Sequence, residues 1–328
     1  MKMDGLLVID KPKGMTSLDV VRTIKARWSL RKAGHVGTLD PFATGVLPIV
    51  MGEGTKLVPF LREDPKEYEA VMKLGEETTT DDYTGEISRR GSWEDLTEET
   101  IRQAFRSFQG RMLQRPPMFS AVKVKGKPLY RMARKGIEID REEREVQLYE
   151  LQVHEIDLPL VHFSVSCSKG TYIRALARDL GRTMGCGAHL LSLRRTRSGS
   201  FTIQQALSIE AVKALSGREV LRSFLIPFKE VLSNLPEVVG DERLLRKVRH
   251  GREMKVGDFD PQILPCFEKG EWLRMTSPEE GLVAILRSEM KREEMSQADP
   301  REVVFRPIRV FHSSLPYTWS PRAQPLAT

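Results

Sequence analysis

The pattern of apolar and polar positions predicts several strands in the first part of the chain. Residues 5–10 (GLLVID) and 45–51 (GVLPIVM) are short apolar runs, each closed by Pro or Gly residues. Runs of this length with such boundaries are typical of buried strands. Residues 68–74 and 161–167 instead alternate apolar and polar positions, which predicts strands with one buried face.

Helical periodicity is interleaved with these strands. A helix through about Trp28 can be capped by Thr16 or Ser17, and residues 96–108 predict a second helix with acids in its first turn. The segment from Thr171 onward (TYIRALARDLG) is amphipathic and predicts a third helix. Strands interleaved with helices indicate an α+β domain.

The pattern changes after residue 235. Short apolar runs punctuated by glycine follow at residues 248–251, 254–257, 272–275, 282–286 and 303–310. Short runs separated by turn residues predict strands of a small β domain. We therefore predict an α+β domain over residues 1–235, a β domain over residues 236–312 and a tail over residues 313–328.

Composition narrows the class of protein. Of the 328 residues, 40% are hydrophobic and 30% are charged, which suits a folded core and excludes a disordered or fibrous chain. No apolar stretch approaches the roughly 18 residues of a membrane-spanning helix, and we expect no signal peptide. Three widely spaced cysteines exclude a disulfide framework and suggest a cytoplasmic protein. The six histidines include no metal-binding pair such as HExxH.

The positive charge is clustered. The net charge is +7, with ten basic residues and no acid between Arg102 and Lys135. Seven basic residues face a single acid between Ser166 and Ser200, whereas residues 76–99 are rich in acids. Clusters of this kind suit a phosphate backbone and favour a nucleic-acid partner, although an ordinary solvated surface is the alternative.

Residues 33–41 (AGHVGTLDP) contain the strongest candidate for chemistry. Pro41 restricts Asp40 to extended conformations, so this carboxylate lies at the end of a loop just before the predicted strand 45–51. Loops held by a rigid scaffold often present active-site acids, but a turn aspartate that caps a backbone amide is the commoner arrangement. Neither a GxxxxGK[ST] phosphate loop nor a GxSxG nucleophile motif occurs in the chain.

Six longer motifs carry a resemblance to a known family. They are DKPKGMTSLDVV (10–21), GHVGTLDPFATGVLPIVMGEGTK (34–56), KEYEAVMKLGEETTTDDYTGE (66–86), RPPMFSAVKVKGKPLYRMARKG (115–136), SKGTYIRALARDLG (168–181) and CGAHLLSLRRTRSG (186–199). In this order they resemble the TruB family of bacterial tRNA pseudouridine synthases. Near the C-terminus, HGREMKVGDF, GLVAIL and FRPIRVF are similar to a PUA domain, a small RNA-binding β-barrel.

The resemblance implies both a fold and a reaction. The fold is the pseudouridine-synthase fold, a mixed and mainly antiparallel sheet with flanking helices, followed by a PUA-like barrel. The reaction isomerises uridine 55 in the T loop of tRNA by detaching the base, turning it and rejoining it through carbon 5. It implies no metal and no cofactor, a base flipped out of its stack, a tRNA T stem-loop as partner, no membrane, and a monomer.

The resemblance also assigns the catalytic residues. Asp40 matches the catalytic carboxylate, which acts either as a nucleophile on the ribose or base, or as a base toward the sugar. Arg174 matches the counter-ion that keeps the carboxylate charged, at about 4 kcal/mol for charges about 4 Å apart. Tyr68 matches a tyrosine that stacks on the flipped base and whose hydroxyl can help to remove the carbon-5 proton.

Three further residues match substrate-binding positions of the family. His35 is expected to wedge into the T loop in place of the flipped base, Tyr172 to pack beside the nucleotide, and Leu193 to form a wall of the pocket. Taken singly, each has an ordinary alternative, which is a backbone-bonded turn for His35 and core packing for the other two.

Two other functions remain open from the sequence. A non-catalytic RNA-binding module would use the same basic clusters, and a pseudouridine synthase for ribosomal RNA or a guided target would use the same chemistry. The joint presence of Asp40, Tyr68 and Arg174 favours an enzyme, because a binding module has no physical need for all three. The enzyme hypothesis requires Asp40 and Arg174 to lie together in the folded protein.

Overall fold

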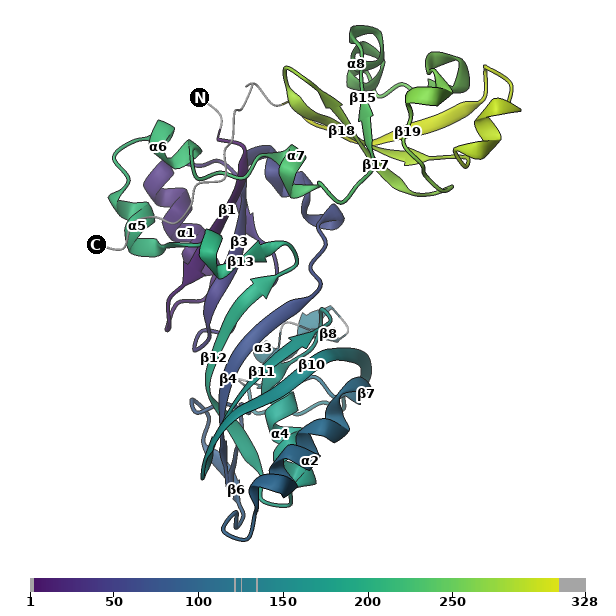
Figure 1. Cartoon of the computed structure of the whole chain (residues 1–328). Helices are drawn as coiled ribbons and strands as arrows, with labels where there is room; N and C mark the ends of the chain where they lie inside the picture. Colours follow the sequence, from purple (N-terminus) through teal and green to yellow (C-terminus); the bar gives the residue numbers. More distant parts are fainter. Residues whose placement is uncertain (1–2, 121, 125, 134, 313–328) are drawn as a thin grey trace.

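The computed structural model describes residues 3–312 apart from 121, 125 and 134, and it contains two main sheets (Figure 1). The larger sheet has ten strands in the order β14-β1-β3-β12-β4-β11-β10-β7, with β2 beside β3 and β13 beside β12. Its strands are β1 (Gly5–Lys11), β2 (Ala33–His35), β3 (Thr44–Met51), β4 (Lys66–Leu74), β7 (Gly110–Gln114), β10 (Arg144–Asp157), β11 (Leu160–Cys167), β12 (Ala188–Ser198), β13 (Phe201–Thr202) and β14 (Leu207–Ser208). The pairs β1/β14 and β3/β12 are parallel and the other described pairs are antiparallel, which confirms the expected mixed sheet.

Helices and two small hairpins surround this sheet. The helices are α1 (Ser17–Trp28), α2 (Glu98–Phe108), α3 (Leu129–Ala133), α4 (Ile173–Thr183), α5 (Ile209–Ala214), α6 (Arg218–Arg222) and α7 (Phe228–Val231), with 3₁₀ turns η1 (Gly52–Lys56), η2 (Val58–Phe60) and η3 (Ile203–Gln205). The hairpins pair β5 (Glu76–Thr78) with β6 (Ile87–Arg90), and β8 (Lys123–Val124) with β9 (Lys127–Pro128). Helix α4 packs on β12 and α2 on β10, whereas α1 lies against β2 and α5 (Figure 1). Within the described part of the chain, no helix is long and apolar enough to cross a membrane.

The predicted elements of the larger sheet form where the residue pattern places them. Strands β1 and β3 are buried along almost their whole length, as continuous apolar runs require. Strand β4 alternates, with Tyr68, Ala70 and Met72 buried and the residues between them more exposed. Thr16 caps α1 by accepting a hydrogen bond from the Asp19 backbone N–H, so the start of this helix is encoded locally.

The second sheet has five strands in the order β15-β17-β18-β19-β16 and curls as a PUA-like half-barrel does. Its elements are β15 (Glu237–Val239), α8 (Glu242–Arg249), β16 (Met254–Lys255), η4 (Val256–Asp258), η5 (Pro261–Ile263), β17 (Trp272–Ser277), β18 (Gly281–Ser288), η6 (Glu293–Ser296) and β19 (Val303–Val310). The strand predicted at residues 248–251 is wrong, because Val248 belongs to α8. Leu244, Leu245 and Val248 form its buried face, and Asp241 caps it by accepting from the Leu244 N–H at 2.7 Å.

The two sheets share a hydrophobic cluster. Leu282 and Ile285 of β18 pack in one cluster with Val46 and Val50 of β3. The Phe60 ring of η2 also meets Trp272 edge-on, with ring centroids 4.9 Å apart. The division into residues 1–235 and 236–312 stays a prediction, and the tail over residues 313–328 lies outside the described residues.

We expect Ile285→Ala to destabilise the protein. The Ile285 side chain is fully buried in the cluster that joins the two sheets, so the truncation leaves a cavity and costs about 2–5 kcal/mol of unfolding free energy. Urea unfolding followed by circular dichroism measures this change. Val239→Ala, at an exposed position of β15, is the control and should change stability by less than about 0.5 kcal/mol. Equal unfolding midpoints for Ile285→Ala and the wild type would contradict the packing described here.

Candidate active site

Asp40 and Arg174 lie together, as the enzyme hypothesis requires. Asp40 lies within the loop between β2 and β3, and Arg174 is in the first turn of α4. The guanidinium donates Nε–H to Asp40 Oδ2 at 2.8 Å and Nη2–H to Oδ1 at 3.1 Å, which is a bidentate ion pair. The Arg174 side chain is 4% exposed and that of Asp40 33%, so the carboxylate keeps an open side while its partner is buried behind it.

Both terminal nitrogens of Arg174 also bond to backbone carbonyls. Nη1 donates to the Thr80 carbonyl at 2.6 Å and Nη2 donates to the Phe119 carbonyl at 2.8 Å, and the Asp82 carboxylate lies 3.7 Å from Nη1. Burial by itself would lower the pKa of Arg174, but the charges of Asp40 and Asp82 outweigh it and raise this pKa above its usual value. Arg174 is therefore a permanent positive charge in a rigid setting.

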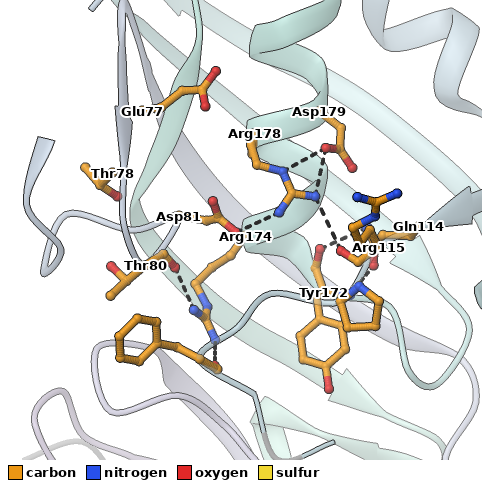
Figure 2. A network of polar contacts seen from close by, with 12 residues as sticks. Glu77, Thr78, Thr80, Asp81, Gln114, Arg115, Tyr172, Arg174, Arg178 and Asp179 are labelled. Carbon is orange, nitrogen blue, oxygen red and sulfur yellow. Dashed lines mark hydrogen bonds and ion pairs between the residues drawn. The ribbon is translucent and has the colours of Figure 1, made fainter. Parts of the chain in front are cut away.

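Two further arginines on the same face of α4 hold the segment that supports Arg174. Arg178 binds Asp81 at 3.0 Å, and Arg182 binds Glu77 at 2.6 Å. Figure 2 shows Arg174 and Arg178 extending from α4 toward Thr80 and Asp81. The spacing of four residues places the three side chains in one row along the helix. We call this row, Arg174, Arg178 and Arg182, the arginine row.

The arginine row corrects part of the charge analysis. The sequence placed these residues in a basic cluster suited to phosphates, but they pair with carboxylates at residues 40 and 77–82. Arg194 of the same cluster pairs with Asp10, and Arg197 pairs with Glu67. The expected positive patch between residues 166 and 200 is therefore largely neutralised by acids from distant parts of the chain.

Tyr68 lies on β4, with its side chain on the same face of the sheet as that of Arg195 directly opposite on β12. The residue is 7% exposed, and burial raises the pKa of its phenol to about 12. Tyr68 is consequently a neutral phenol near pH 7. The negative charge of Asp40 adds to this upward shift of the Tyr68 pKa, which indicates that the two side chains are close.

Tyr172 and Leu193 line the same region. Tyr172 is the N-cap residue of α4 and half-buried, and its backbone exchanges two hydrogen bonds with the Gln114 side chain, which Figure 2 shows. Burial, and after it the charge of Asp40, raises the pKa of the Tyr172 phenol. Leu193 is buried on β12 opposite Ala70 and shares a hydrophobic cluster with Tyr68.

His35 is at the end of β2 and half-buried. Burial lowers the pKa of its imidazole, and the charge of Arg195 lowers it further, so the ring is neutral near pH 7. Its Nδ1 is buried and has no hydrogen-bond partner among the described residues. The structure thus does not support the backbone-bonded turn that was the alternative for this nitrogen.

The sequence analysis did not single out two buried cations near Asp40. Lys11 at the end of β1 is fully buried, and its Nζ donates to the carbonyls of Pro12, Met15 and Pro41 at 2.9, 2.7 and 3.2 Å. Burial lowers the pKa of Lys11 to about 8. Arg195 is the second such cation. The available signal was their position within strands of the larger sheet, where a side chain is often buried.

An open cleft of about 740 Å³ borders the arginine row on another side, lined in part by Arg115, Arg141, Arg178 and Arg182. Its lining residues do not include Asp40 or Tyr68. The convergence of a partly open carboxylate, a buried guanidinium and two tyrosines defines a chemical site, whereas this cleft mixes acids and arginines without such a centre. We therefore assign the active site to the surroundings of Asp40.

Comparisons with known proteins identify the family of the chain. The model of the TruB family pseudouridylate synthase N-terminal domain matches residues 25–173, and that of the tRNA pseudouridylate synthase B C-terminal domain matches residues 174–233. The chain is 48% identical to tRNA pseudouridine synthase B of Geobacter sulfurreducens over 76% of this chain and 82% of the relative. It is 44% identical to that of Syntrophus aciditrophicus over 94% of this chain and 99% of the relative.

Solved structures share the fold over nearly the whole chain. The Cbf5-Nop10-Gar1 complex contains a chain that is 31% identical with a TM-score of 0.71, covering 94% of this chain and 85% of that one. An H/ACA RNP bound to a substrate RNA contains one that is 28% identical, also at 0.71, covering 97% and 87%. The fold is that of a pseudouridine synthase. Within that class, the chain belongs to the TruB family.

Proposed function

We propose that this protein isomerises uridine 55 in the T loop of tRNA to pseudouridine. Membership of the TruB family supports the conversion of a tRNA uridine, since relatives over most of the chain are named tRNA pseudouridine synthase B. The observation that carries the proposal is the bidentate Asp40–Arg174 pair, with its carboxylate partly open to solvent. A non-catalytic RNA-binding module would not need a buried guanidinium whose nitrogens all have partners at that position.

The reaction breaks the bond between N1 of uracil and carbon 1′ of the ribose and forms a bond between carbon 5 and carbon 1′. Carbon 5 loses a proton and N1 gains one, so the product is an isomer and no electrons are exchanged with a second reactant. Asp40 serves as the nucleophile toward ribose or base, or as a base toward the sugar. In each case it acts through its carboxylate oxygens, which the two hydrogen bonds from Arg174 hold in position.

The uridine must leave its stack to reach Asp40, which costs a few kcal/mol. His35 offers a flat neutral ring that can occupy the vacated place in the loop. Tyr68 and Tyr172 offer aromatic faces for the flipped base, and Leu193 an apolar wall. All of these residues come from one chain, which supports a monomer as the active form, and a tRNA substrate supports action in the cytoplasm.

The decisive experiment uses unmodified tRNA transcripts. After incubation with purified protein, carbodiimide modification and primer extension should give a stop at uridine 55 and at no other uridine. A transcript with cytidine at position 55 is the control. Product in ribosomal RNA fragments but not in tRNA would favour the alternative substrate, and binding without any product would favour the RNA-binding module.

Tyr68→Phe should keep tRNA binding and slow the reaction. The phenylalanine ring still stacks on the base, but the hydroxyl that can take part in moving the carbon-5 proton is lost, so the single-turnover rate should fall about 10²-fold or more. Release of tritium from tRNA labelled at carbon 5 measures this rate. If Tyr68→Phe reacted at the wild-type rate, the Tyr68 hydroxyl would have no role in the reaction and the ring would serve only to stack on the base.

A further inference from the structure

Arg195 is a fully buried arginine with one unused nitrogen. Its relative exposure is 0%, and it is one of the largest fully buried side chains in the described protein. Nε donates to the Val46 carbonyl at 2.7 Å and Nη2 donates to the Gly37 carbonyl at 2.9 Å. Nη1 has no hydrogen-bond partner among the residues described. A buried donor without a partner is unusual and requires an explanation.

The two satisfied nitrogens attach Arg195 to both ends of the catalytic loop. Gly37 lies three residues before Asp40, and Val46 lies in β3, which follows the loop. Gly37 has a φ of +69°, and a Cβ there would lie 3.4 Å from Nη1. The left-handed backbone at Gly37, which residues with a side chain rarely adopt, is what favours glycine at this point of the loop.

The unused nitrogen is on the face of the sheet that carries Tyr68. In the β4/β12 register Arg195 is directly opposite Tyr68, and both side chains are buried. Burial is the main influence on the Tyr68 pKa and raises it, whereas the nearby positive charge of Arg195 lowers it. The other groups that act on this phenol are Cys167 and Asp40. Arg195 is thus the cation that faces the Tyr68 hydroxyl.

We propose that Arg195 is a positioning residue that holds the catalytic loop and directs its free Nη1 at the Tyr68 oxygen during the isomerisation. The proposal rests on the function proposed above. Tyr68 is a neutral phenol, so it must first give its own proton to N1 of the detached uracil, and the phenolate that results then removes the proton from carbon 5. The phenolate formed in between is stabilised by the Arg195 charge, and Tyr68 ends the reaction as a phenol.

Two substitutions separate charge from packing. Arg195→Gln keeps a donor for a loop carbonyl and removes the charge, whereas Arg195→Lys keeps the charge. In protein labelled with 3-fluorotyrosine, whose phenol is more acidic, fluorine NMR follows the titration of Tyr68, and Tyr68→Phe identifies its signal. We expect Arg195→Gln to raise the Tyr68 midpoint by about one pH unit or more and Arg195→Lys to leave it near the wild-type value. Arg194→Gln, on the opposite face of β12, is the charge-matched control and should not move the midpoint.

Kinetics then test whether Arg195 acts through Tyr68. Arg195→Gln should lower the single-turnover rate at least tenfold while tRNA affinity changes less than about twofold, and it should cause no further loss in the Tyr68→Phe protein. The proposal would be overturned if Arg195→Gln lowered the rate equally in the wild-type and Tyr68→Phe proteins and left the Tyr68 titration midpoint unchanged. That result would show a purely structural role for Arg195. If Arg195→Gln does not fold, Arg195→Lys is tested in the same cycle, and a loss that persists in Tyr68→Phe refutes the idea. Failure of both variants to fold would also refute it.

The outcomes distinguish this inference from the proposed function. A wild-type protein that makes no pseudouridine would refute the proposed function, while the fluorine titration would still show whether Arg195 acts on Tyr68. If the wild type is active but the Tyr68 titration midpoint is the same in Arg195→Gln, only the inference is refuted.

Discussion

Asp40→Asn will abolish pseudouridine formation, with a fall in the single-turnover rate of at least about 10⁴-fold. The asparagine side chain has nearly the same shape, and its Oδ1 can still accept a hydrogen bond from Arg174. It lacks the negative charge, however, so it serves neither as the nucleophile nor as the base of the reaction. Tritium release from tRNA labelled at carbon 5 measures the rate, because the proton leaves carbon 5 only when the new carbon–carbon bond replaces it.

The same variant must bind tRNA and fold for this result to be informative. We expect its tRNA dissociation constant in a filter-binding assay to stay within about threefold of the wild type, which corresponds to less than 1 kcal/mol. Asp10→Asn, which changes the carboxylate paired with Arg194, is the matched control and should retain turnover. Substantial turnover by Asp40→Asn would remove Asp40 from the chemistry.

The second large effect is expected for Arg174→Met, which should lose both activity and stability. The apolar side chain leaves the buried Asp82 carboxylate and the carbonyls of Thr80 and Phe119 without their donor, and it leaves Asp40 without its counter-ion. Removal of one partner from a buried ion pair costs about 3–5 kcal/mol. Urea unfolding should show a loss of about this size, together with turnover below one-hundredth of the wild-type rate.

Arg174→Lys distinguishes charge from geometry. Lysine keeps a positive charge but cannot form the two parallel bonds to Asp40, so we expect intermediate stability and strongly reduced turnover. Arg246→Met, which breaks the exposed pair of Arg246 with Glu242 on α8, should change stability by less than about 0.5 kcal/mol. If Arg174→Met unfolded at the same urea concentration as Arg246→Met, the ion pair would not have the structural role described here.

The sequence predicts local elements well where the cause is local. The buried runs of β1 and β3, the alternation of β4 and the Thr16 cap of α1 depend on residues within a few positions of one another. The same local logic fails for Val248, where a short apolar pattern is shared by a strand and by the last turn of α8. Only the packing of the second sheet against α8 decides between them.

The catalytic pair illustrates what motif resemblance adds. Asp40 and Arg174 are separated by 134 positions, and no periodicity joins them. Each lies in a motif that resembles the TruB family, and on this basis the sequence predicted their contact. Tyr68, Tyr172 and Leu193 were placed by resemblance too, and the structure brings their strands and helix to the same region.

By itself, the sequence determined most of the element types and the family, and it singled out the carboxylate that we propose for the chemistry, because these reside in short contiguous segments. Only the tertiary structure decided which charged side chains pair with an opposite charge. The arginine row, Arg194 and Arg197 all have acidic partners from other segments, and Arg195 is buried beside the phenol of Tyr68. Counting charges along the sequence does not show which opposite charge lies next to each side chain in the folded protein. The electrostatic energy depends on the distance between the two charges in space.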